Sequence, residues 1–257
     1  VPTLQKVDVK QPGDSTILSL PVQTFQTFNN CGPATFSMML AYFDITVSQQ
    51  ELGQKLRPWQ NPQGINDDKS VTVAELADEA KNYNFIPYYR PNGDIQKLKL
   101  FLANDLPVLT RTWLKEDEDI GHYRVVKGFD ESTKEIIQND SLQGADLRFG
   151  YGEFLRLWQG FNYEYLVLVP PEKKEIVEAI LGTETDEKVA WKNALGRAQK
   201  ESVENPQNPY LIFNQSVAYY QLGQYQEAHK TGKERQCTIL HTIPTPNSSI
   251  KTWQLWR

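Results

Sequence analysis

The most constraining feature of the sequence is a change of pattern at Pro170-Pro171. Before this pair, the chain holds both helical patterns and β-rich segments; after it, the pattern is helical. A proline pair followed by Glu172-Lys173-Lys174 interrupts regular structure, because proline lacks the backbone N–H that helices and sheets use. We therefore expect an α+β domain over residues 1–171 and a small all-α domain over residues 172–257.

Several local signals define elements of the first domain. In the capping box Thr72-x-x-Glu75, each side chain accepts a hydrogen bond from the other residue's backbone N–H, which marks a helix start. Residues 130–134 form a loop of hairpin length, so the flanking strands should pair. The expected elements are one or two short strands within residues 1–30, helices over 31–43, 72–83, 94–102 and 154–158, and strands over 106–113, 122–129, 135–140 and 163–169.

The second domain carries a repeat-like signal. Predicted helices cover 186–203, 209–222 and 225–236, and the segment 213–228 resembles a tetratricopeptide repeat, although a plain helical hairpin stays an alternative. A free-standing repeat array usually needs about three units. We therefore expect these helices to pack on the first domain or on a partner protein, with Trp191, Phe213 and Tyr220 buried, and residues 242–247 to form a loose tail.

Composition excludes several classes of function. The 27 Lys and Arg residues face 32 Asp and Glu residues, a net charge of −5, and they form no basic cluster. This argues against binding to nucleic acid or to an anionic membrane surface. No apolar run approaches the ~18 residues of a membrane span. Two cysteines and three histidines argue against a zinc site, and we expect neither a metal nor an organic cofactor.

Cys31 lies where a thiol can become reactive. It begins a predicted helix, and Asn29 and Asn30 before it are expected helix caps. The positive end of the helix dipole should stabilise the thiolate and lower the thiol pKa below about 8.5. Gly32 leaves room beside the sulfur for a substrate carbonyl. The alternative is a buried structural cysteine.

His122 and Asp140 are expected to meet in space. They lie on the two strands of the predicted hairpin, so folding about its loop brings them close together. A thiolate needs an imidazole that accepts and returns a proton, and the imidazole needs an acceptor on its other nitrogen. Individually, His122 could be a strand-edge histidine and Asp140 a turn residue. Together with Cys31 they predict a catalytic triad.

Three segments resemble a known family. The sequence around Cys31, the strand with His122 and the Asn139-Asp140 pair look like those of the C-thirty-nine peptidase family. Its members are papain-fold cysteine peptidases related to those that cleave double-glycine leader peptides. The resemblance covers about residues 17 to 171. The matching segments are 26–35, 121–130 and 139–140.

This resemblance implies a role for each site residue. Cys31 would be the nucleophile, His122 the general base and acid, Asp140 the orienting carboxylate, and Gln26 the side-chain donor of the oxyanion hole. Asn139 is a rival third member of the triad, since papain-like enzymes can use asparagine there.

Two departures from the family pattern concern these assignments. The family's glutamine usually precedes the cysteine by six positions and Gln26 by five, which leaves Gln23 as a poorer candidate. The family usually has Asp-Pro where this chain has Asp140-Ser141.

The expected activity is hydrolysis of a peptide or related amide bond through a thioester on Cys31. The alternative is a non-catalytic module that keeps the peptidase fold, binds a peptide and recruits a protein partner through the helical repeats. The start at Val1 indicates that an N-terminal segment was removed, and the family resemblance predicts an exported or membrane-tethered bacterial protein, with a cytoplasmic location open. The acidic run 115–119 reads more readily as a solvated loop than as a site for a basic substrate.

Overall fold

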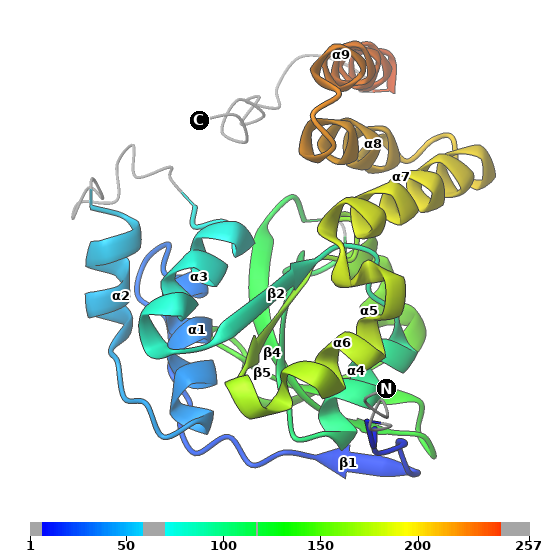
Figure 1. The fold of residues 1–257 in the computed structure, drawn as a ribbon. Helices are drawn as coiled ribbons and strands as arrows, with labels where there is room; N and C mark the ends of the chain where they lie inside the picture. The colour runs from blue at the N-terminus through cyan, green and yellow to red at the C-terminus, as the bar shows by residue number, and fades with distance from the viewer. Residues whose placement is uncertain (1–6, 59–69, 117, 243–257) are drawn as a thin grey trace.

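The structure of the protein, a computed structural model, describes residues 7–58, 70–116 and 118–242, with side chains described as far as residue 233 (Figure 1). Its strands are β1 (Ser15–Ile17), β2 (Ile86–Arg90), β3 (Val108–Trp113), β4 (Gly121–Asp130), β5 (Glu135–Asp140), β6 (Gly144–Gly150) and β7 (Tyr165–Val169). Its α-helices are α1 (Cys31–Tyr42), α2 (Gln49–Leu56), α3 (Val73–Ala80), α4 (Ile95–Ala103), α5 (Tyr151–Gln159), α6 (Lys174–Leu181), α7 (Glu187–Glu204), α8 (Pro209–Gln221) and α9 (Tyr225–Thr242). The predicted α+β architecture with a helical C-terminal region is confirmed.

One antiparallel sheet organises the first part of the chain. Its strand order is β2-β7-β3-β4-β5-β6, and β1 pairs with β4 beside this path. The predicted hairpin is present, with Arg124 of β4 opposite Asp140 of β5. The β4 strand is therefore central and holds His122 at its start, in register with Thr112 of β3.

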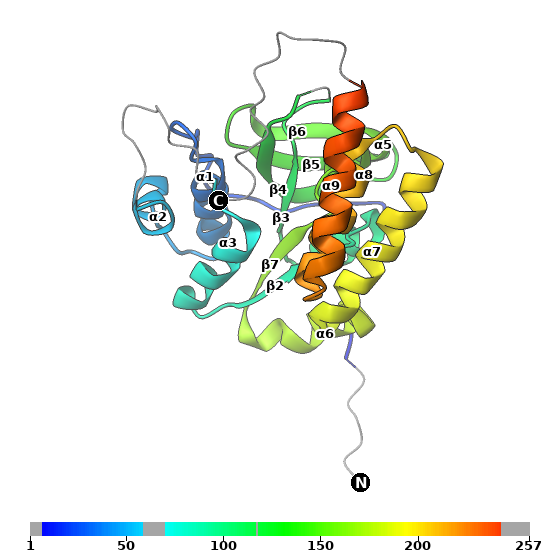
Figure 2. The ribbon, with the colours of Figure 1, turned by 90° about the horizontal axis from the view of Figure 1, so that it is seen from above.

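Helices cover both faces of the sheet, as the two views show (Figures 1 and 2). On one face, α1, α2 and α3 enclose a core with Phe36 and Leu76, to which the sheet contributes Val125 and Leu166. On the other face, α4, α5 and α6 pack on a second core. Because neighbouring strand residues point to opposite faces, the strands β2, β3, β4 and β7 each supply both cores. The first core fixes α1, and with it Cys31, against β4.

Caps define the starts of α3 and α4 as predicted. The Thr72 and Glu75 capping box is formed at α3, and the Asp94 side chain accepts the backbone N–H of Lys97 at α4. The α2 helix was not predicted, although its cap Ser48, which accepts the N–H of Glu51, is a recognisable start signal. The strands β2 and β6 and the helix α6 were also not predicted.

The C-terminal helices pack on the first part of the chain. Val177 of α6 is buried in the core beneath the sheet, and the Trp191 ring of α7 lies 6.1 Å from that of Tyr89 on β2. The helices α7, α8 and α9 then lie side by side (Figure 2). The expected burial of Trp191 is confirmed and Phe213 is half-buried, but Tyr220 is exposed, so that part of the expectation is wrong. The domain boundary near residue 171 stays a prediction.

Two further expectations fall at the end of the chain. The α9 helix continues to Thr242, beyond the predicted end at residue 236. The rest of the predicted loose tail, 243–247, lies outside the described residues. Among the helices that the structure describes, none has the length and apolar character needed to cross a membrane.

Candidate active site

Cys31 is the first residue of α1 and is half-buried. The preceding Asn30 holds the N-cap position, but its side chain makes no capping hydrogen bond, so the cap expected there is wrong. Its amide instead donates to Thr27 Oγ1 at 2.8 Å and accepts from Arg57 Nη1 at 2.7 Å. The buried Arg57 also donates to the carbonyl of Asn29 at 2.9 Å. These hydrogen bonds fix the loop before Cys31. The Asn30 side chain does not cap the first-turn N–H groups of α1.

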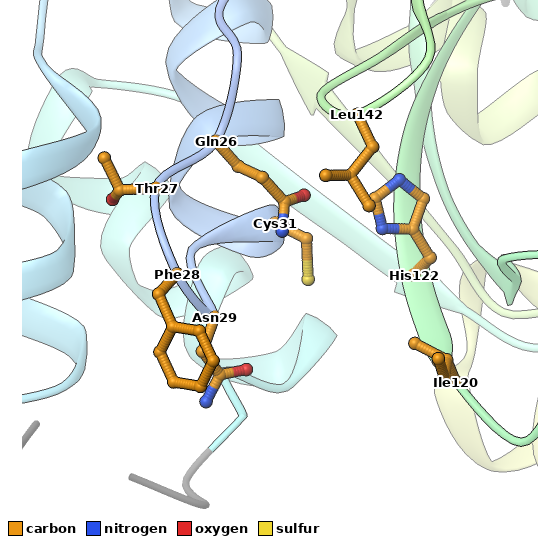
Figure 3. Close-up of a pocket in the computed structure, with 9 residues that line it drawn as sticks. Gln26, Thr27, Phe28, Asn29, Cys31, Ile120, His122 and Leu142 are labelled. Atoms are coloured by element: carbon orange, nitrogen blue, oxygen red, sulfur yellow. The ribbon is translucent and has the colours of Figure 1, made fainter. Parts of the chain in front are cut away.

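Cys31 and His122 face one open cavity of about 340 Å³ from opposite walls (Figure 3). Cys31 comes from α1 and His122 from β4, and one ring nitrogen of His122 is turned toward the cysteine side. The rim is apolar: Phe28 is 66% exposed, Ile120 53% and Leu142 48%. Exposed apolar groups of this size around a cavity are typical of a binding surface.

The His122 ring is held by Asp140, as the hairpin predicted. Its Nε2 lies 3.0 Å from Oδ1 of Asp140, and both side chains are buried. The same oxygen accepts the backbone N–H groups of Leu142 at 2.6 Å and Gln143 at 2.9 Å. A carboxylate that accepts from Nε2 leaves Nδ1 as the ring nitrogen available to the cavity.

Asp140 is held in its ionised form. Burial raises the pKa of this carboxyl, but the hydrogen bond and charge of His122 and the charge of Arg124 outweigh burial, so the pKa lies well below its usual range. An ionised carboxylate only accepts hydrogen bonds. Asp140 can therefore fix the orientation of the imidazole without exchanging a proton with it.

Arg124 is a site residue that the sequence did not reveal. Its Nε donates to Asp140 Oδ2 at 2.7 Å, and both side chains are fully buried. Its other nitrogens donate to Thr112 Oγ1 at 2.5 Å, to the carbonyl of Leu114 at 2.8 Å and to Gln143 Oε1 at 3.0 Å. The available signal was an arginine within the otherwise apolar run 123–126, since a buried arginine needs a partner.

Gln26 lies at the cavity and its amide is oriented. The amide oxygen accepts from Ser141 Oγ at 2.6 Å, and the backbone N–H donates to the Ser141 carbonyl at 2.9 Å. Since the oxygen is engaged, the Nε2 group is left for the cavity that Gln26 and Cys31 both line. Ser141, where the family usually has proline, thus supplies a hydroxyl that orients Gln26.

The two alternative residues lie elsewhere. Gln23 Nε2 donates to the backbone carbonyl of Asp140 at 2.7 Å, and Gln23 does not line the cavity. Asn139 is buried, and its Oδ1 accepts the N–H of Asp146 on β6 at 3.3 Å. Asp140, not Asn139, is therefore the residue that contacts the imidazole.

The thiol pKa differs from expectation. Burial raises the pKa of the Cys31 thiol above its ordinary value. The backbone N–H groups of Gly32 and Tyr123 and the positive charges of Arg111 and Arg57 lower it by less. The predicted lowering at the helix N-terminus is therefore overturned by desolvation, and the resting cysteine is a thiol at neutral pH.

The structure offers no cluster for a metal ion: among the described residues, no group of three or more His, Cys, Asp or Glu side chains could hold one.

Comparison with known families decides the relationship. The model of the Peptidase_C39 like family matches residues 17–166, which is more than half of the chain. The chain belongs to this family. The family match contains Cys31, His122, Asp140 and Gln26 and ends within β7. Helices α6 to α9 therefore lie outside the part that this peptidase family model describes.

Solved structures include similar C39-like peptidases. A putative C39-like peptidase from Bacillus anthracis is 18% identical, with a TM-score of 0.47, over 61% of this chain and 98% of that chain. The peptidase domain of Streptococcus ComA, a bifunctional ABC transporter, is 19% identical, with a TM-score of 0.45, over 59% and 99%. A double-glycine-motif protease from an AMS/PCAT transporter, in complex with its leader peptide, is 23% identical, with a TM-score of 0.44, over 62% and 96%. A comparison with curated proteins finds no match.

Proposed function

We propose that the protein is a cysteine peptidase that hydrolyses a peptide bond through Cys31, His122 and Asp140. The observation that carries this proposal is that Cys31 and His122 face one cavity while the ionised Asp140 holds the imidazole from behind, at 3.0 Å. Membership of a peptidase family supports it. The peptide as substrate class rests on the same membership.

In the proposed first step, Nδ1 of His122 accepts the thiol proton as the Cys31 sulfur attacks the substrate carbonyl carbon. The electron pair of the carbonyl moves to its oxygen, and the oxyanion accepts hydrogen bonds from the Cys31 backbone N–H and Gln26 Nε2. The imidazolium then protonates the leaving amine as the C–N bond breaks. The acyl group remains on sulfur as a thioester.

In the second step, His122 takes a proton from water as the water oxygen attacks the thioester. The C–S bond breaks, the acid product leaves, and the sulfur regains its proton. Because burial raises the pKa of Cys31, the resting site holds a protonated thiol. The imidazole therefore acts as a general base during the attack, in contrast to a site that stores a thiolate beforehand.

A non-catalytic peptide-binding module is the competing function. The raised thiol pKa favours it, because the thiolate is the nucleophilic form of cysteine. The C-terminal helices would then serve to recruit a protein partner, as the tetratricopeptide repeat resemblance predicts. That resemblance, and an exported or membrane-tethered bacterial location, stay predictions under either function.

Cleavage of a peptide library distinguishes the two functions. The parent protein and a Cys31→Ala variant are incubated with a library of random decapeptides, and the products are sequenced by mass spectrometry. Alanine is a good helix former, so the variant should fold as the parent does, which its melting temperature checks. Cleavage by the parent alone supports the peptidase. No cleavage by either protein would favour the binding module.

A further inference from the structure

A second cavity, of about 430 Å³, lies between the first part of the chain and helix α8. Polar contacts fix this interface: Asn162 Nδ2 donates to the Asn214 carbonyl at 3.0 Å, and Asn214 Nδ2 donates to the Gln159 carbonyl at 2.6 Å. The rings of Trp113 and Tyr210, both of which line the cavity, lie 4.8 Å apart. The cavity is therefore bounded by ordered elements and has the size of a small-ligand site.

Two opposite charges line this cavity. In the pairing of β3 with β7, Thr110 lies opposite Tyr165. Arg111 and Glu164 are the next pair along these strands, so they lie opposite each other on one face of the sheet, and both line the cavity. In the part of the chain that the structure describes, neither makes an ion pair within 4 Å. The Arg111 guanidinium carbon instead lies 4.5 Å from the centre of the Phe161 ring. A guanidinium that stacks on a ring keeps N–H groups at its edge for a ligand.

The charges favour an anionic ligand. Arginine stays protonated in proteins. Burial raises the pKa of the Glu164 carboxyl, although the charge of Arg111 and the Tyr89 hydroxyl lower it. Of the two charges, the negative charge of Glu164 is therefore lost more readily than the positive charge of Arg111. A carboxylate is the group that a free guanidinium edge binds with two parallel hydrogen bonds.

Gly121 connects the second cavity to the catalytic one. It lines the cavity of Cys31 and His122, and a Cβ added to it would lie 3.2 Å from the Phe161 ring and 3.8 Å from Arg111 Nε. An extended peptide advances about 3.3 Å per residue. A peptide whose carbonyl lies at Cys31 can therefore place a side chain a few residues away beside Arg111.

We propose that this cavity is a substrate subsite in which Arg111 binds the carboxylate of an Asp or Glu side chain of the peptide. The proposal rests on the proposed peptidase function for the position of the peptide. Helix α8 supplies one wall through Phe213 and Val217. Because α8 lies outside the family match, this wall of the subsite comes from the C-terminal helices, which the family model does not include.

Peptide capture tests the subsite without requiring catalysis. Full-length Cys31→Ala protein is immobilised, and the random decapeptide library is passed over it. Retained peptides should carry Asp or Glu at one position about tenfold above the input. An added Arg111→Gln substitution should abolish this enrichment. An added Glu164→Gln substitution should keep or increase it, because it removes the competing negative charge without changing size.

Further variants guard against a folding artefact. If Arg111→Gln lowers the melting temperature, Arg111→Lys replaces it, since lysine keeps the charge and loses the two-pronged geometry, and the enrichment should fall by several fold. Retained peptides without acidic enrichment, an enrichment of Lys or Arg, no retention at all, or an acidic enrichment that survives both Arg111 substitutions would overturn the subsite. A parent protein that cuts nothing while Cys31→Ala retains acidic peptides would overturn only the peptidase function.

Discussion

Nε of Arg124 lies 2.7 Å from Oδ2 of Asp140, the oxygen that His122 does not contact. One oxygen of the Asp140 carboxylate therefore binds Arg124, and the other binds the imidazole of His122. Arg124 also binds the carbonyls of Trp113 and Leu114, where β3 ends. We infer that Arg124 is a positioning residue, which fixes the carboxylate that orients the imidazole.

Loss of Arg124 should therefore destabilise the fold. In Arg124→Met, the fully buried Asp140 would lose its cation, and removal of one partner of a buried pair typically costs about 3–5 kcal/mol. Chemical denaturation measures this loss. Arg148→Met is the matched control on β6, because Arg148 is 42% exposed where it meets Glu135, and it should cost less than about 1 kcal/mol. Equal losses of unfolding free energy in the two variants would contradict a stabilising ion pair between Arg124 and the buried Asp140.

The lowered pKa of Asp140 predicts a dependence of stability on pH. A carboxyl whose pKa is lower in the folded than in the unfolded state stabilises the fold above the unfolded value of about 3.9. That contribution is lost as pH falls through the folded pKa, which lies well below the usual range. Urea denaturation from pH 3 to 5 should show the difference in unfolding free energy between parent and Asp140→Asn growing as pH rises. A difference that stays constant over this range would show that the partners of Asp140 do not lower its pKa in the folded state.

Gln26 and Ser141 should contribute to rate more than to stability. Removal of one oxyanion donor typically costs about 10² to 10³ in kcat, and we expect this range for Gln26→Ala. Ser141→Ala should have a smaller effect, because the amide remains but its orientation is free. Gln54→Ala, at an exposed position of α2, is the control. A Gln26→Ala enzyme with parental kcat would exclude Gln26 from the oxyanion hole.

The docking of the C-terminal helices should stabilise the part of the chain that holds the candidate active site. Trp191 is 1% exposed and contacts Tyr89 of β2, so Trp191→Ala should cost about 3–5 kcal/mol. Val203→Ala on the same helix is the control, because Val203 is 82% exposed. Both costs are measured by the melting temperature. If the two variants melt alike, the helices do not stabilise the rest of the chain.

The sequence predicted the pairing within the site better than its electrostatics. The meeting of His122 and Asp140 followed from a hairpin, which is a local property of 19 residues, and the structure shows it. The pKa of Cys31 depends on how deeply the folded chain buries the sulfur, which no local pattern contains. Arg124 was missed for a related reason, since its partners come from β3, β5 and the turn after β5.

The same distinction holds for the fold. Helices with clear caps, such as those after Thr72 and Asp94, begin where the sequence predicts. The edge strand β6 was missed because only one of its seven residues is buried, so its β pattern is weak. The second cavity could not be foreseen, because it exists only where α8 meets strands that lie about a hundred residues earlier in the chain.

Direct detection of an acyl group on Cys31 tests whether this cysteine is the nucleophile. Parent protein is mixed with a library peptide that it cleaves, or with an ester of that peptide, and quenched in acid within milliseconds to seconds. Mass spectrometry of the digested protein then locates any added acyl mass. The proposed mechanism predicts an acyl group on Cys31 in the parent and its slower formation in His122→Ala. In Cys31→Ala, both the acyl group and all cleavage should be absent. Cleavage by Cys31→Ala at the parental rate, or an acyl group found only on Cys237, would contradict this mechanism.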